Sequence, residues 1–416
     1  MSEAWIAPAR SAEARALYAA AEADRAAHPE RYRLDPDTLL ARALGDDPVD
    51  ALGDDDWREG FARYLESAAE DGRLNALGTR MAGDTAVGRL RARRAMARHL
   101  AAHPDVRERR LLAPIVITGG WRTGTTFLFR MLATDPRLRA PLPAELAAPW
   151  RFRRLAGAER EAALDAAASR HATLHRLNPA LATIHDSGAR LPEECVLAMG
   201  TDFRNWGFPS TTRLDGYAKW LAGESFAGAY RRYRAMLQAL HSDERRFLLK
   251  APSHCAELAS LLDAFPDACI VHLHRDIVET IASGASLFAV FRSTYSDAVD
   301  PHDVGRFQTE QTALWLDRAL AFRERDAARW RDARFVDLDY RALVADPIGA
   351  ARRVYEAIGA ELPPEVAARF EQYGSANRQH ARGPHRYDAS IFGLDAGALR
   401  ERFARYEERF GLRERR

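Results

Sequence analysis

The stretch that decides the fold is Pro114-Ile-Val-Ile-Thr-Gly-Gly-Trp-Arg-Thr-Gly-Thr-Thr126. Its apolar run Ile115–Ile117 is typical of a buried parallel strand. Gly119, Gly120 and Gly124 then interrupt the strand, and apolar residues at helical spacing follow. Glycine lets successive backbone N–H groups point inward, and a helix N-terminus adds partial positive charge. The stretch therefore predicts a strand, an anion-binding turn and a helix.

This turn differs from the P-loop of nucleotide-binding proteins. The spacing Gly119-x4-Gly124 is that of a P-loop, but Thr125 stands where the P-loop lysine belongs. The nearest cation is Arg122, which lies inside the loop. A glycine-rich turn alone can simply tighten a strand–helix connection. Arg122, Thr125 and Thr126 favour anion binding instead.

Strands alternate with helices after residue 115, which predicts an α/β, P-loop-type three-layer fold with a central parallel sheet covered on both faces. Further strands are expected over Phe247–Leu249, Cys269–Leu273 and Arg334–Asp337. Helices are expected over Ala158–Arg176, Glu193–Met199, Tyr217–Leu240, His254–Phe265, Ile277–Phe288, Gln308–Trp330, Pro347–Ile358 and Leu399–Phe410.

Residues 1–110 are predicted to form a helical N-terminal extension, and residues 111–416 the main domain. Acidic N-cap candidates and apolar residues three and four apart indicate helices over 11–27, 35–44, 57–69 and 85–102. No residue spacing in this extension suggests catalysis. We expect it to pack on the following domain and to cover its substrate cleft.

The charge balance limits the possible partners. The chain has 61 basic and 59 acidic residues, a net charge of +2, and so lacks the basic excess of a nucleic-acid-coating protein. Only two of the basic residues are lysines, Lys219 and Lys250. Codon bias explains the excess of arginine, but a lysine in such a chain can mark a position that needs a compact ammonium group.

The cysteines and the hydropathy of the sequence indicate in which cellular compartment the protein is expected. Three cysteines without C-x-x-C spacing predict neither a disulfide framework nor a zinc site, and they favour a reducing cytoplasm. No apolar stretch approaches the ~20 residues of a membrane span. The N-terminus lacks the pattern of a signal peptide. His171 and His175 are one helical turn apart but have no third ligand nearby, so no metal is expected.

A second informative segment follows the strand Cys269–Leu273. The strand would deliver His274, Arg275 and Asp276 to its carboxyl end, where open α/β sheets bind ligands. Ser283 follows Arg275 by about two helical turns, so both side chains could contact one anion. A purely structural Arg–Asp pair is the alternative.

At this point the chain resembles sulfotransferases that use 3′-phosphoadenosine 5′-phosphosulfate (PAPS), most of all a bacterial branch with a helical N-terminal extension. The loop Gly119–Thr126 is similar to the family's 5′-phosphosulfate loop. Arg275 and Ser283 are similar in type and spacing to its 3′-phosphate pair. The resemblance extends over about residues 40–412, and these two motifs are its most specific parts.

Three further segments resemble the family. Leu249-Lys-Ala-Pro252 is similar to its Leu-Lys-Ser-Pro segment, with Ala251 in place of the usual serine. Val336-Asp-Leu-Asp-Tyr340 is similar to a strand and turn whose tyrosine lies near the nucleotide. Arg382-Gly-Pro-His-Arg-Tyr387 is similar to a late basic loop that closes over the 3′-phosphate.

The resemblance implies PAPS as co-substrate, 3′,5′-adenosine bisphosphate (PAP) as product, and no metal. Arg122 and Lys250 would stabilise the oxygens on which charge grows in the transition state. The residues implied in donor binding are Gly120, Trp121, Arg122, Thr123, Gly124, Thr125, Thr126, Arg275, Ser283, Tyr340, Arg382, His385 and Arg386.

An acceptor loses a proton as it attacks, so a general base is expected. Glu145 follows the loop and helix at the distance where several sulfotransferase branches place a catalytic glutamate. An ordinary acid at a helix N-terminus is the alternative. His185 and the pair Glu193-Glu194 are the other candidates.

The leading hypothesis is a cytoplasmic sulfotransferase that acts in line on a hydroxyl or amine of a small molecule. It predicts no nucleic-acid partner and no membrane span. A P-loop kinase or NTPase with altered motifs and a nucleotide-binding scaffold without catalysis are the alternatives. The sequence identifies neither the acceptor nor the oligomeric state.

Overall fold

The computed structural model describes residues 5–184, 187–377 and 388–412. Its centre is a parallel sheet of five strands in the order β2-β3-β1-β4-β5. The strands are β1 (Ile115–Gly119), β2 (Leu138–Arg139), β3 (Arg246–Lys250), β4 (Cys269–His274) and β5 (Arg334–Asp339). The predicted α/β class with a central parallel sheet is confirmed.

Strand β1 lies in the middle of the sheet, and the strands that follow it in sequence are added first on one side of it and then on the other. The register pairs Ile117 with Lys250 on β3 and Gly119 with Leu273 on β4. The chain first builds β2 and β3 on one side of β1 and then crosses to β4 and β5 on the other. Ligands of open α/β sheets bind at such a switch point, beyond the carboxyl ends of the strands. The glycine-rich loop therefore begins where a ligand is expected.

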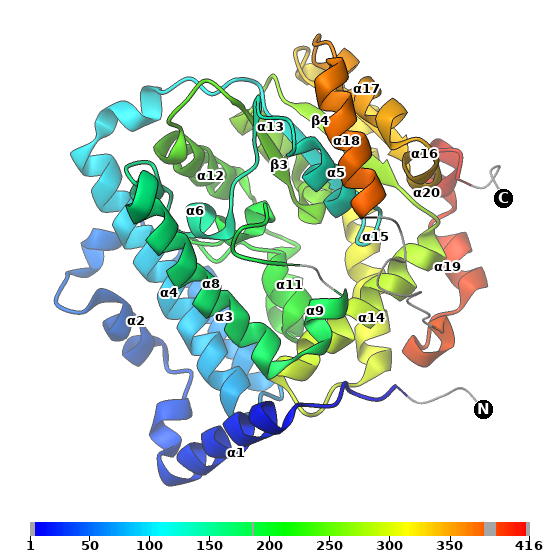
Figure 1. Cartoon of the computed structure of the whole chain (residues 1–416). Helices are drawn as coiled ribbons and strands as arrows, with labels where there is room; N and C mark the ends of the chain where they lie inside the picture. Colours follow the sequence, from blue (N-terminus) through cyan, green and yellow to red (C-terminus); the bar gives the residue numbers. More distant parts are fainter. Residues whose placement is uncertain (1–4, 185–186, 378–387, 413–416) are drawn as a thin grey trace.

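Helices cover both faces of the sheet (Figure 1). Ile115 and Ile117 face α5 (Thr125–Leu132), α17 (Pro347–Ala357) and α18 (Pro364–Ala376). Val116, between them, faces the opposite way, because side chains alternate along a strand. That second face packs under α12 (Ala227–Leu240), α13 (Leu258–Ala264), α14 (Ile277–Tyr295) and α15 (Pro301–Arg325).

Nine further helices follow the glycine-rich loop among the described residues. They are α6 (Pro143–Ala147), α7 (Pro149–Phe152), α8 (Gly157–Leu177), α9 (Ala180–Ile184), α10 (Gly207–Thr211), α11 (Asp215–Leu221), α16 (Tyr340–Ala345), α19 (Ala396–Arg402) and α20 (Ala404–Arg409). No helix among the described residues is long and apolar enough to cross a membrane.

Several expected helices were wrong in extent. The segment Tyr217–Leu240 is two helices, α11 and α12, because the chain turns at Gly223, whose N–H donates to the carbonyl oxygen of Trp220. Likewise, Leu399–Phe410 is α19 and α20, and Gln308–Trp330 is the later part of α15 followed by a short 3-10 turn. Periodicity alone does not mark such breaks.

The most consequential difference concerns Glu193–Met199, where only Cys195–Leu197 is helical and forms a single 3-10 turn. Glu194 is extended (φ −71°, ψ 144°). The Glu193 N–H donates to the carbonyl oxygen of Pro141, a partner in another segment. This tertiary hydrogen bond keeps the start of the segment extended.

The N-terminal helices are α1 (Ala12–Ala27), α2 (Pro36–Leu44), α3 (Arg58–Glu70) and α4 (Ala76–Ala102). They lie along one side of the molecule (Figure 1). The rings of Phe61 and Tyr64 on α3 lie 5.2 and 5.8 Å from that of Phe203, within one apolar core. A domain boundary near residue 110 stays a prediction.

Helix α1 and the residue that caps α4 form hydrogen bonds with the C-terminal end of α14. The Tyr18 hydroxyl donates to the carbonyl oxygen of Thr294, and the Asn75 N–H donates to that of Tyr295. Ser283 lies on this helix, near the glycine-rich loop. The N-terminal helices thus support an element of the candidate site.

Candidate active site

The loop after β1 depends on glycine at two positions. Gly119 has φ +146° and Gly124 has φ +90°, which only glycine adopts readily. A Cβ on Gly119 would lie 2.4 Å from the carbonyl oxygen of Leu273, and one on Gly124 would lie 3.0 Å from the Tyr340 ring. The loop can therefore curl tightly between β4 and α16 only without side chains at these positions.

Within the loop, Thr123 and Arg122 have distinct roles. The Thr123 hydroxyl is buried and donates to the carbonyl oxygen of Gly120 at 2.8 Å, which closes the turn. Arg122 has φ +63°, a conformation that costs a non-glycine residue about 1–2 kcal/mol. Its Nε donates to Ser283 Oγ at 3.3 Å and its Nη1 to the carbonyl oxygen of Ile184 at 3.2 Å. The strained backbone thus directs the guanidinium toward α14.

The loop and the start of α5 border a cavity of about 420 Å³. The first N–H groups of a helix have no acceptor within it, so the α5 N-terminus favours an anion. A cavity of this size matches those that hold small ligands. Its lining residues are Trp121, Arg122, Gly124, Thr125, Thr126, Phe127, Glu194, Pro252, Arg275, Leu287, Tyr340, Leu343, Val344, Pro347, Gly374 and Asn377.

Arg275 lies beside the loop, as expected. Its Nη1 donates to the carbonyl oxygen of Arg122 at 2.8 Å, and its Nη2 pairs with Glu279 Oε2 at 2.8 Å. Its guanidinium stands over the Tyr340 ring, 4.4 Å from the centroid. The structure therefore brings Arg122, Arg275 and Tyr340 to one cavity. Ser283 does not line it but accepts a hydrogen bond from Arg122. Their roles in binding a donor stay predictions.

Lys250 ends β3 with its side chain fully buried. Its Nζ donates to Glu194 Oε1 at 2.7 Å and to Thr126 Oγ1 at 3.2 Å. Both acceptor residues line the cavity. The sequence marked Lys250 by its rarity and by the resemblance, but it did not predict that Glu194 is its partner.

Glu145 is not among the residues that line this cavity. Its Oε2 accepts from the Leu142 N–H at 2.8 Å, and its Oε1 lies 3.0 Å from Arg160 and 3.7 Å from Arg139. This arrangement matches the alternative, an acid at a helix N-terminus that pairs with nearby cations. Its catalytic role stays untested.

Four other candidates lie outside the described residues, so the structure does not bear on them. They are His185, Arg382, His385 and Arg386.

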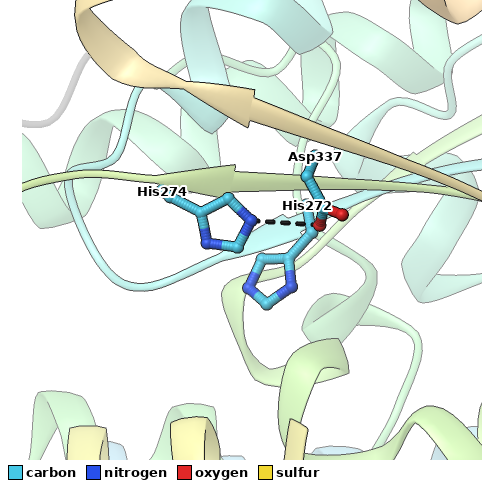
Figure 2. A group of neighbouring side chains, drawn as sticks. All are labelled: His272, His274 and Asp337. Atoms are coloured by element: carbon cyan, nitrogen blue, oxygen red, sulfur yellow. Dashed lines mark hydrogen bonds and ion pairs between the residues drawn. The ribbon is translucent and has the colours of Figure 1, made fainter. Parts of the chain in front are cut away.

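A separate group of metal-ligand type lies on β4 and β5 (Figure 2). The His274 Nε2 lies 3.1 Å from Asp337 Oδ1, and the His272 ring stands 4.2 Å from the His274 ring. Arg323 also donates to both Asp337 oxygens, at 3.0 and 2.9 Å. Its positive charge disfavours a cation at this carboxylate. We interpret the group as an ion-pair network that joins β4, β5 and α15.

Acid should destabilise the protein from about pH 6.5 downward. Burial lowers the pKa of His254 to about 3 and the pKa of His272 well below its ordinary value. The unfolded chain therefore takes up these protons first, and the stability present above pH 6.5 is lost as the pH falls. Each histidine contributes about 1.4 kcal/mol per pH unit in that window.

Urea unfolding at pH 8, 7, 6 and 5 measures this dependence. His254→Asn removes one titrating group, so its free energy of unfolding should fall less steeply with acid. Equal slopes for the two proteins would contradict the assignment.

Comparison with known proteins agrees with this geometry. Residues 114–364 match the model of the sulfotransferase family. The chain is 26% identical over 263 residues to the Omega-hydroxy-beta-dihydromenaquinone-9 sulfotransferase Stf3 of Mycobacterium bovis and to that of Mycobacterium tuberculosis. The match covers 59% of this chain and 62% of each relative, so it spans about three fifths of their length.

Two solved structures are similar over most of the chain. Sulfotransferase STF1 from Mycobacterium tuberculosis H37Rv superposes with a TM-score of 0.74 and 28% identity, covering 88% of this chain and 98% of that one. Sulfotransferase STF9 from Mycobacterium avium gives a TM-score of 0.76 and 27% identity, covering 90% and 95%. Both similarities extend beyond the sheet into the N-terminal helices.

Proposed function

Because this chain belongs to the sulfotransferase family, we propose that it transfers a sulfuryl group from PAPS to a hydroxyl or amine of a small molecule. One observation carries the proposal. The glycine-rich loop, which has Arg122 inside it and Thr125 where a P-loop lysine would stand, shares one cavity with Arg275 and with Thr126, to which Lys250 donates.

In this proposal the two ends of the donor are held by different elements. The loop and the hydroxyls of Thr125 and Thr126 hold the 5′-phosphosulfate end. Arg275 and Ser283 hold the 3′-phosphate, with Tyr340 beside the nucleotide. The hydrogen bond between Arg275 and the Arg122 carbonyl oxygen supports this division, because it couples the two anion-binding positions.

The proposed transfer needs charge stabilisation at the oxygen that leaves sulfur. Arg122 lines the cavity, and Lys250 is buried directly behind it, where its ammonium group donates to the lining residues Thr126 and Glu194. These are the two cations that the proposal assigns to this task. Phosphoryl transfer needs Mg²⁺ to neutralise a triphosphate, whereas a sulfuryl group carries less charge. The proposal therefore includes transfer without a metal ion.

The acceptor is proposed as a small molecule, and a terminal alcohol is the first class to test. The mycobacterial relatives are named as sulfotransferases of omega-hydroxy-beta-dihydromenaquinone-9, which carries a hydroxyl at its omega end. The proposed location is the cytoplasm, which the odd number of cysteines and the lack of C-x-x-C spacing favour.

Thermal unfolding with added ligands tests the proposal. PAP should raise the melting temperature in the presence of EDTA, and labelled PAPS should pass its sulfur to an acceptor in a screen of alcohols and amines. Stabilisation by ATP with Mg²⁺ but not by PAP would support the kinase alternative. Binding of PAP without transfer to any acceptor would support the scaffold alternative.

Arg275→Ala should weaken PAP binding by about tenfold to a hundredfold, the value of one charge-assisted contact of ~1.5–3 kcal/mol. Turnover at saturating donor should change far less, because Arg275 is assigned to the 3′-phosphate and not to the reacting centre. Calorimetric titration with PAP measures the dissociation constant. An unchanged constant would contradict the assignment of Arg275.

A further inference from the structure

A carboxylate stands at the wall of the cavity, next to the cation that the proposal assigns to the leaving oxygen. Glu194 lines the cavity, and its side chain is 14% exposed. Its Oε1 accepts a hydrogen bond from the Lys250 Nζ at 2.7 Å. Lys250 also donates to Thr126 at the start of α5. Glu194 is thus held at the loop by the residue that would contact the donor.

The backbone around Glu194 is fixed from several directions. The Glu194 N–H donates to Glu193 Oε1 at 3.0 Å, and the Glu193 N–H donates to the carbonyl oxygen of Pro141 at 3.2 Å. Cys195, the next residue, is buried. The 3-10 turn that begins there accepts a hydrogen bond at the Leu197 carbonyl oxygen from Arg89. A group held this firmly can keep one orientation toward a reacting atom.

The other carboxylate candidate has different surroundings. Both Glu145 oxygens face partners that belong to its own helix cap or to arginines, and Glu145 does not line the cavity. Glu194 combines access to the cavity with a position beside Lys250. A general base must come within hydrogen-bond reach of the proton that it removes.

The geometry points to Glu194 as the general base of the proposed transfer, with Lys250 as the partner that positions it. This inference rests on the proposed function and identifies a residue of the same site. It also assigns a change of partner to Lys250. The ammonium group holds Glu194 before the donor binds and turns to the donor's bridging oxygen afterwards, which frees the carboxylate.

The step balances within these groups. The acceptor oxygen forms a bond to sulfur while the bond between sulfur and the bridging oxygen breaks. The electron pair of that bond stays on the 5′-phosphate of PAP, where Lys250 donates a hydrogen bond. Glu194 takes the proton of the acceptor hydroxyl and later releases it to water.

The test compares Glu194→Gln with Glu145→Gln and with the surface control Glu161→Gln. Turnover of labelled PAPS is measured with geraniol and with 4-nitrophenol as added acceptors. Hydrolysis of PAPS is measured without an added acceptor, because water is present in every assay. Glu194→Gln should lower turnover with geraniol by about 10²–10⁴-fold, because an amide cannot accept the proton. The loss should be smaller with 4-nitrophenol, which ionises in water near neutral pH. The acidic limb of the pH–rate profile should also disappear.

Binding of PAP gives a readout that is independent of turnover. Glu194→Gln should bind PAP at least as tightly as the unchanged protein, because a negative charge beside the phosphate site is gone. A tenfold or larger loss of PAP affinity would assign Glu194 to donor binding and overturn the inference. Full turnover with geraniol in Glu194→Gln would overturn it too, and the same loss in Glu145→Gln alone would transfer the role to Glu145.

The controls separate the possible failures. Glu161→Gln removes a surface carboxylate that pairs with Arg190 and should leave turnover unchanged. If Glu194→Gln has a lower melting temperature than the unchanged protein, Glu194→Asp is used instead, because it keeps the carboxylate. Glu194→Asp should retain the acidic limb of the pH–rate profile with reduced turnover. A profile of this variant without the acidic limb would overturn the inference. An unchanged protein that neither binds PAP nor transfers label contradicts the proposed function itself.

Discussion

Replacing Lys250 by methionine should lower the turnover of sulfuryl transfer by about 10²–10³-fold, the usual cost of removing one group that stabilises transition-state charge. Methionine keeps an apolar side chain of similar length, whereas it lacks the Nζ that lies 5.8 Å from the centroid of the Phe129 ring. The change therefore removes mainly the ammonium group. Because PAP lacks the sulfuryl group, its binding should change much less than turnover. Calorimetry with PAP and initial rates with PAPS measure the two effects.

Lys219→Met is the matched control, because Lys219 is the other lysine of the chain and lies exposed on α11. It should leave both measurements unchanged. Equal losses of PAP affinity and of turnover in Lys250→Met would instead assign Lys250 to ground-state binding of the nucleotide.

Arg122→Ala should also lower turnover by about 10²–10³-fold. The guanidinium donates to Ser283 Oγ, and Arg275 donates to the Arg122 carbonyl oxygen, so Arg122 lies between the two proposed anion positions. Arg122→Lys keeps the positive charge but lacks the planar guanidinium with its several N–H donors. It should therefore recover part of the turnover that Arg122→Ala loses. Steady-state kinetics at saturating PAPS measures this effect.

Arg190→Ala is the control for loss of an arginine. Arg190 pairs with Glu161 and Asp165 at the surface, where such pairs contribute little to stability. It should behave like the unchanged protein. Full turnover of Arg122→Ala at saturating PAPS would contradict the proposed role of Arg122 in the transition state.

The strand, the loop and the helix start were predictable because they depend on local chemistry. Four β-branched residues in a row, then glycines at 119 and 124, favour a buried strand and a tight turn whatever surrounds them. The structure has this strand at Ile115–Gly119 and positive φ angles at both glycines. The position of Arg275 was expected from the rule that ligands bind at the carboxyl ends of strands, and that of Ser283 from its distance of about two helical turns.

The partner of Lys250 was not predictable in the same way. Glu194 lies 56 residues before Lys250 in the chain. The expected helix over Glu193–Met199 did not predict toward which segment the Glu194 side chain points. The helix is absent there because the Glu193 N–H donates to the carbonyl oxygen of Pro141, a contact between distant segments. Glu145 and Glu194 looked alike as sequence, and only their surroundings separate them.

The sequence by itself determined the fold class, the glycine-rich loop and the resemblance to sulfotransferases, because each depends on neighbouring residues or on fixed spacing. The tertiary structure decided which ionisable groups meet. Two arginines and a backbone N–H surround Glu145, whereas Lys250 holds Glu194 at the cavity. The energy of a charge depends on what surrounds it in three dimensions, and chain order does not specify that.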